Sequence, residues 1–144
     1  MIECDRRLLW HGMLLFLLGL LTGFVIQQFS NPRMALAAHL EGILNGLFLL
    51  VLGAIWAQVR LSLRAARVAR GCVLYGAYVN WGITTVAAAL GTSALTPITA
   101  AGHTAAPWAE RLAAIGFGSV GVAMLIASAL LSWGLRGRGI AAGG

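Results

Sequence analysis

The stretch MALAAHLEGILNGLFLLVLGAIWA, residues 34–57, decides the fold of this protein. It is long enough to cross the ~30 Å hydrocarbon layer of a bilayer, which takes about 20 residues of α-helix. Its only strongly polar residues are His39, Glu41 and Asn45, and all the others are aliphatic, aromatic or small. The stretch therefore predicts a transmembrane helix over residues 34–57 that carries a few polar groups.

Three further apolar runs predict helices at about residues 8–28, 69–91 and 111–135. Hydrophobic residues make up 60% of the 144 residues, charged residues only 10%, and the mean hydropathy is +0.88. A soluble domain carries about 25% charged residues, because its surface must be polar. The composition excludes a soluble globular domain. It predicts an all-α integral membrane four-helix bundle, with residues 1–144 forming a single membrane domain.

The ten basic residues are all arginines, and most fall on one side of the predicted membrane. Only Arg33 and Arg111 lie on the other side. Because cytoplasmic segments are enriched in basic residues, this eight-to-two bias predicts a multi-pass protein of a bacterial-type inner membrane with both termini in the cytoplasm. The placement of the arginines between apolar runs also argues against nucleic-acid binding. The eight on the cytoplasmic side are Arg6, Arg7, Arg60, Arg64, Arg67, Arg70, Arg136 and Arg138.

Glycines recur at helical spacing in the predicted spans, at Gly19 and Gly23 in the first and at Gly42 and Gly46 in the second. Small residues let helix backbones approach closely in lipid. The spacing suits packing within one protomer. It equally suits a small face that receives a neighbouring subunit or a flat cofactor.

His39 is one of the few ionisable residues predicted inside the membrane, where such groups are functional candidates because their burial is costly. With Gly42 and Gly46 it forms an i, i+3, i+7 stripe on one helix face. One imidazole that can hold a metal, beside two positions without side chains, suits a planar macrocycle. The alternative is a histidine that hydrogen-bonds across helices near the membrane interface.

A second group of polar and aromatic residues lies on other helix faces. Glu41 and Asn45 are four residues apart on the second predicted helix, on a face away from His39. With residues of the third predicted helix, Asn45 predicts an apolar pocket that has a few hydrogen-bonding groups. Alternatively, Asn45 and Asn80 bond each other and hold two helices together. The candidates on the third helix are Tyr75, Tyr78, Asn80, Trp81, Thr84 and Thr85.

The connection over residues 91–110 is the only long one, and it carries His103. We expect it outside, as a short cap on the membrane surface. The sequence holds no Ser-His-Asp arrangement, phosphate loop, carboxylate pair or HExxH motif. An enzyme built on this chain would therefore depend on a bound cofactor for its chemistry.

Three segments resemble a known family, the hydroxylaminobenzene mutases. They are RLLWHGMLLFL at residues 7–17, NPRMALAAHLEGILNG at residues 31–46, and YVNWG at residues 78–82. The likeness covers about residues 6–135. The HG of the first helix and the AH…G…NG pattern of the second are similar, more distantly, to styrene oxide isomerase.

The resemblance implies a membrane isomerase, or mutase, that depends on haem. It would convert hydroxylaminobenzene-type arylhydroxylamines to 2-aminophenols by intramolecular hydroxyl transfer, as in nitroaromatic degradation, with ferric haem as a Lewis acid. It also implies a homotrimer with haem b at the subunit interface. His39 would then be the axial ligand of the haem iron, with Gly42 and Gly46 beside the ring.

The same resemblance places Asn45 in the substrate pocket, whereas the pocket tyrosine of styrene oxide isomerase has its nearest match at Thr84, with Tyr78 on a different turn. Our mechanistic hypothesis makes Asn45, Asn80 and Tyr78 catalytic, whereas Trp81 and Thr84 would bind the small aromatic hydroxylamine.

Two other classes remain open. The first is a membrane haem b electron-transfer subunit, which usually needs two axial ligands, whereas His11 is expected at the cytoplasmic side of the membrane and His39 at the outer side. The second is a small four-helix multidrug-type transporter, which needs an acidic residue within its first membrane helix. Here Glu41, near the end of the second helix, is the only candidate.

Overall fold

The computed structural model describes residues 4–136, and in that range every regular element is helical. Four helices are long and apolar enough to cross a membrane, which confirms the all-α expectation with four helices of spanning length. They are α1 (Arg6–Phe24), α2 (Pro32–Ile55), α3 (Leu63–Leu90) and α5 (Pro107–Gly134). The short elements are the 3₁₀ turns η1 (Ile26–Gln28) and η2 (Trp56–Gln58) and the single-turn helix α4 (Pro97–Ala100).

The helix boundaries differ from the predicted ones where polar residues continue a helix. α3 begins six residues before the predicted start, because Ser62 caps it by accepting a hydrogen bond from the Ala65 amide. It ends at Gly91, whose φ of 69° is left-handed. α5 begins at Pro107 instead of residue 111. Apolar runs mark only the part of a helix that suits hydrocarbon, so they underestimate the length of both helices.

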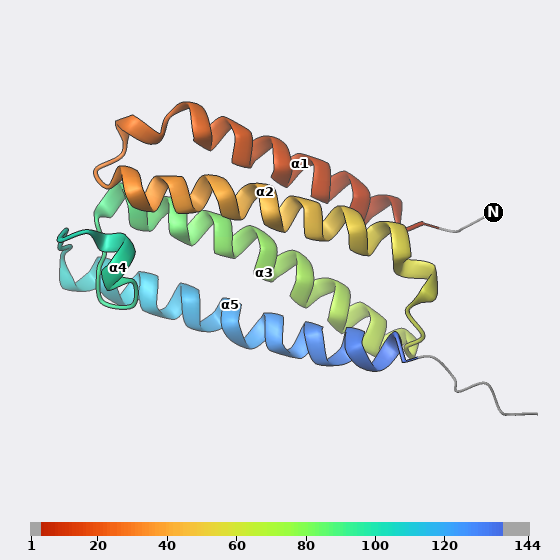
Figure 1. Ribbon diagram of the computed structural model, residues 1–144. Coiled ribbons are helices and arrows are strands. Elements are labelled where there is room, and N and C mark those ends of the chain that lie inside the picture. Colours follow the sequence, from red (N-terminus) through yellow and green to blue (C-terminus); the bar gives the residue numbers. More distant parts are fainter. Residues whose placement is uncertain (1–3, 137–144) are drawn as a thin grey trace, which may run out of the picture.

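The four long helices lie side by side in chain order, so that α1 packs on α2, α2 on α3 and α3 on α5 (Figure 1). Within residues 4–136, α1 and α5 form opposite edges of this row and make no extended contact. The arrangement is therefore more open than the bundle that the sequence predicts. Its core joins α1, α2, α3 and α5 through Leu8, Leu15, Leu49, Val73 and Leu131.

Glycines bring α1 and α2 into direct backbone contact. A Cβ atom on Gly19 would lie 2.6 Å from the Ile43 nitrogen, and one on Gly42 would lie 2.5 Å from the Gly19 Cα. A Cβ on Gly46 would lie 2.6 Å from the Phe16 nitrogen. Real side chains do not tolerate such distances, so these glycines serve packing inside the protomer, the first of the two alternatives above.

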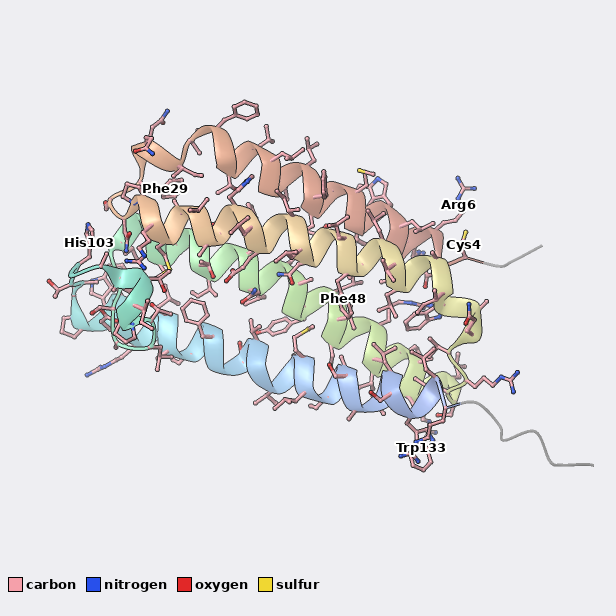
Figure 2. All side chains as sticks on the ribbon, in the orientation of Figure 1. Cys4, Arg6, Phe29, Phe48, His103 and Trp133 are labelled. Carbon is pink, nitrogen blue, oxygen red and sulfur yellow. The ribbon has the colours of Figure 1, made fainter. Side chains whose placement is uncertain are left out.

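At one end of the row, the chain start bonds the end of α2, and the α2–α3 connection bonds the end of α5. The Asp5 amide donates to the Gly53 carbonyl at 2.9 Å, and the Arg60 amide donates to the Gly134 carbonyl at 2.8 Å. Asp5 also caps α1 and pairs with Arg70. Arg6 and Trp133 are labelled at this end in Figure 2. All the arginines assigned above to the cytoplasmic side belong to this end, except Arg138, which lies outside the described residues.

The connection between α3 and α5 covers the opposite end, where α4 packs on α2 (Figure 1). The buried Asn31 side chain caps α2 and donates to the carbonyls of Thr99 and Ala100 at 2.9 and 3.1 Å. His103 lies in this connection (Figure 2), and its ring Nδ1 donates to the Ala100 carbonyl at 2.8 Å. The α3–α5 connection therefore forms a cap over the helix ends that these hydrogen bonds hold in place.

Candidate functional site

His39 projects from α2 toward α1. Its ring Nδ1 lies 2.8 Å from the carbonyl oxygen of Gly19. A carbonyl oxygen can only accept a hydrogen bond, so Nδ1 carries a proton, and in the neutral imidazole Nε2 then keeps its lone pair. This is the arrangement found in metal-ligating histidines, in which a partner of one nitrogen fixes the tautomer of the other.

The His39 ring lines a shallow, open hollow of about 310 Å³ between α1 and α2. Gly23 makes room for the ring, since a Cβ atom there would lie 2.7 Å from Nδ1 and 2.8 Å from Cε1 of His39. The other lining residues are apolar, namely Leu20, Phe24, Ile26 and Leu36. The site is therefore an oriented imidazole in an apolar surface hollow.

The glycines predicted to lie beside a flat ring, Gly42 and Gly46, are covered by α1. Both are buried, and the nearest atoms belong to Gly19, Trp81, Phe16 and the Gly12 carbonyl. The open surface expected at these two positions is filled by a neighbouring helix of the same protomer. The glycine that faces the imidazole is instead Gly23.

Asn45 lies on the face of α2 that packs against α3. Its side-chain Nδ2 donates to the Ala77 carbonyl at 3.3 Å. Asn80 lies on α3 and is half-buried. No direct hydrogen bond between Asn45 and Asn80 is found within residues 4–136, so the alternative in which the two amides bond each other does not hold in this protomer.

Glu41 and Thr84 form a second polar contact between α2 and α3, with the Thr84 hydroxyl beside the Glu41 carboxyl. Thr84 is only 1% exposed. Glu41 Oε2 has no hydrogen-bond partner in the described part of the chain. A buried acceptor oxygen is thus left without a partner at the α2–α3 contact.

Two of the three aromatic candidates of α3, Tyr78 and Trp81, reach across to α1. Tyr78 places its hydroxyl 3.1 Å from Nδ1 of His11, and the same hydroxyl lies 3.3 Å from the His11 carbonyl. Trp81 donates from Nε1 to the Thr22 hydroxyl at 3.1 Å. Both rings are half-buried against the core. They form an aromatic face between α1 and α3.

The structure thus separates the predicted site residues into two groups. His39 lies on the α1 side of α2, whereas Asn45 and Thr84 lie at the α2–α3 contact and Asn80 is half-buried on α3. Sequence reasoning did not assign roles to His11, Thr22 and Gly23. A histidine and a tyrosine 67 residues apart give no local signal, but the Gly19/Gly23 spacing did mark the helix face that receives His39.

No group of three or more His, Cys, Asp or Glu side chains within residues 4–136 could hold a metal ion. A haem brings four nitrogen ligands of its own and needs as few as one from the protein. The donor set around His39, with one free imidazole nitrogen and apolar neighbours, fits such a group.

The sequence model of the styrene oxide isomerase family matches residues 4–136. The chain belongs to the styrene oxide isomerase family. Two proteins of Ectopseudomonas oleovorans are similar to this chain. Hydroxylaminobenzene mutase HabB is 48% identical over 132 residues, which cover 91% of this chain and 80% of that protein. Hydroxylaminobenzene mutase HabA is 37% identical over 125 residues, which cover 86% of this chain and 93% of that protein.

These names confirm the resemblance found in the sequence. Styrene oxide isomerases and mutases both rearrange a single molecule, and the prediction that this member of the styrene oxide isomerase family is an enzyme of the isomerase class is confirmed. No solved structure matches the chain significantly.

Proposed function

We propose that this member of the styrene oxide isomerase family is a mutase that converts hydroxylaminobenzene-type arylhydroxylamines to 2-aminophenols. The support is that both relatives are named for hydroxylaminobenzene, at 48% and 37% identity. In this reaction the N–O bond breaks, a C–O bond forms at the ortho carbon, and a proton is lost from that carbon and gained by nitrogen. Substrate and product are isomers, so the reaction consumes no oxidant or reductant.

We propose His39 as the axial ligand of a haem b iron. The observation that carries this assignment is the bond between His39 Nδ1 and the Gly19 carbonyl, which leaves Nε2 free in an open apolar hollow. When bound, ferric haem supplies a Lewis acid that withdraws electron density and so favours cleavage of an N–O bond. Gly42 and Gly46 then support the site indirectly, by letting α1 carry Gly19 close to α2.

The remaining roles belong to residues at the α2–α3 contact and its aromatic face. Asn45 and Asn80 offer amide groups that orient the polar end of the substrate, and the Tyr78 and Trp81 rings hold its aromatic ring. Thr84 contributes a buried hydroxyl. An apolar surrounding keeps water from capturing a reactive nitrogen-bearing species.

The His39 hollow opens outward, so a second copy of the chain is the cover that we propose for it. Phe24 is 85% exposed and Leu36 47% exposed at its rim, an apolar surface that suits lipid as well as a subunit contact, and the resemblance to styrene oxide isomerase favours the subunit contact. Haem at that contact would bring the outward-facing His39 of one subunit near the pocket of the next. The number of subunits, three, follows the resemblance to styrene oxide isomerase.

We also propose that the four long helices cross a bacterial-type inner membrane with both termini in the cytoplasm. The support is that the arginine-rich end carries the chain start and the α2–α3 connection, whereas Arg33 and Arg111 belong to the opposite end. The isomerase relatives weigh against the electron-transfer and transporter alternatives.

The test is an absorption spectrum of the detergent-purified protein, expressed with haem supplied, together with an assay of 2-aminophenol formation from hydroxylaminobenzene. We expect a Soret band and activity in the wild type, and the loss of both in His39→Ala. His103→Ala is the matched control, because His103 lies in the cap and bonds only its own segment. A colourless wild type, or a His39→Ala variant that keeps haem and activity, would contradict the cofactor assignment.

A further inference from the structure

Glu41 carries an acceptor that the fold leaves without a partner. Its Oε2 atom is buried and has no hydrogen-bond partner within residues 4–136, and the Thr84 hydroxyl lies beside the same carboxyl group. Buried polar atoms are almost always paired, and a carboxyl group inside a membrane helix is particularly costly to leave unpaired. A buried acceptor oxygen without a partner indicates a site that a ligand completes.

The position of the pair ties it to the proposed substrate pocket. Asn45 lies one turn along α2 from Glu41, and Asn80 lies one turn along α3 from Thr84. Asn45 already bonds across to α3 at Ala77. Glu41 and Thr84 therefore extend the row of amide groups at the α2–α3 contact by one turn toward the end of the molecule that α4 covers.

The chemistry of the pair distinguishes the two substrates for which members of this family are named. A hydroxylamino group has N–H and O–H donors, whereas an epoxide oxygen only accepts. An ionised carboxyl group presents only acceptor oxygens. An acceptor at Oε2 therefore suits the hydroxylamine and disfavours the epoxide, whose oxygen would face another acceptor.

We propose that Glu41 is the residue that selects an arylhydroxylamine over an aryl epoxide, by accepting a hydrogen bond from the hydroxylamino group, with the Thr84 hydroxyl beside it as a second partner. This assignment rests on the proposed function, because it assigns the specificity of the same pocket. It is independent of which residue holds the cofactor.

The experiment compares two constants in the same mutase assay, the KM for hydroxylaminobenzene and the inhibition constant Ki of styrene oxide added as a competitor. Glu41→Leu removes the acceptor, and we expect the KM to rise about tenfold while the Ki stays the same or falls. Glu41→Gln keeps an acceptor oxygen and adds a donor. In that variant we expect little change in the KM and a lower Ki.

Both variants should therefore lower the ratio of Ki to KM, whereas a purely structural role would raise both constants together. Thr84→Val should raise the KM several-fold. Thr85→Val is its matched control, since the Thr85 hydroxyl bonds the Trp81 carbonyl of its own helix and should leave both constants unchanged. If Glu41→Leu does not fold, the assignment of Glu41 is tested by the Ki of styrene oxide for the Glu41→Gln variant alone.

A wild type that does not convert hydroxylaminobenzene contradicts the proposed function and this inference with it. An active wild type whose Glu41 variants keep the wild-type ratio of Ki to KM contradicts only the assignment of Glu41.

Discussion

The Tyr78 hydroxyl on α3 lies 3.1 Å from Nδ1 of His11 on α1, so two helices that barely touch are joined through their side chains. A second tyrosine of α3, Tyr75, makes a similar bond of 2.8 Å to Ser119 on α5. The two tyrosines thus tie α3 to both edges of the row, and only Tyr78 lies on the proposed aromatic face.

Replacing Tyr78 by Phe tests whether its hydroxyl or its ring is needed. We expect the free energy of unfolding to fall by about 0.6–1 kcal/mol, the usual worth of such a bond in a membrane protein, and kcat to stay within about threefold of the wild type. Tyr75→Phe is the control, because it also removes a tyrosine hydroxyl of α3, the one that bonds Ser119. A drop in kcat of about a hundredfold or more in Tyr78→Phe alone would instead show that the hydroxyl takes part in proton transfer.

Gly23→Ala should weaken haem binding without removing the ligand. The added Cβ would lie 2.7 Å from His39 Nδ1, so the imidazole must shift and its bond to Gly19 must lengthen. We expect at least a tenfold loss of haem affinity, measured by titrating the apoprotein and following the Soret band. Gly82→Ala is the control, because no atom lies within 4 Å of a Cβ at that position. Equal haem affinity in the two variants would contradict the role given to Gly23.

Gly42→Ala should destabilise the α1–α2 contact. Its Cβ would lie 2.5 Å from the Gly19 Cα, and a backbone atom cannot move aside without separating the helices. Overpacking of this kind typically costs about 1–3 kcal/mol. Gly121→Ala in α5 has open space and should be neutral or slightly stabilising, since Ala favours helix more than Gly. Thermal unfolding in detergent, followed by circular dichroism, compares the two; equal midpoints would be inconsistent with a backbone contact.

Asn31→Ala should loosen the cap over the helix ends. Asn31 is 1% exposed, caps α2 and holds the carbonyls of Thr99 and Ala100, so its loss removes three hydrogen bonds. We expect a loss of about 2–3 kcal/mol and faster protease cleavage within residues 91–106. The control is Ser62→Ala, which removes one exposed cap bond of α3. Cleavage at the wild-type rate would show that the cap has other anchors.

The sequence was sufficient to predict the four long helices but not which helix faces pack against each other. Length and hydropathy identify four spans, because a bilayer imposes a minimum apolar length on each of them. Neither property says which face meets which helix, so the sequence could not tell that α1 would cover Gly42 and Gly46. It did separate the faces of His39 and Asn45 correctly, because both belong to one helix whose periodicity is fixed.

Contacts between distant segments explain most of what the sequence did not reveal about the site. The pairing of His11 with Tyr78 and of Thr22 with Trp81 depends on how α1 and α3 lie across α2, which no local pattern encodes. The unpaired state of Glu41 Oε2 is likewise visible only once its neighbours are known.

The group that orients His39 is a main-chain carbonyl, so no side-chain replacement at Gly19 deletes it. The proton on the imidazole is governed instead by the register of two helices. A slide of α1 by one residue along α2, a shift of ~1.5 Å, would distort that hydrogen bond. Lipid thickness or detergent choice, by altering how the two helices pack against each other, would therefore alter the affinity of the proposed haem site without a change in sequence.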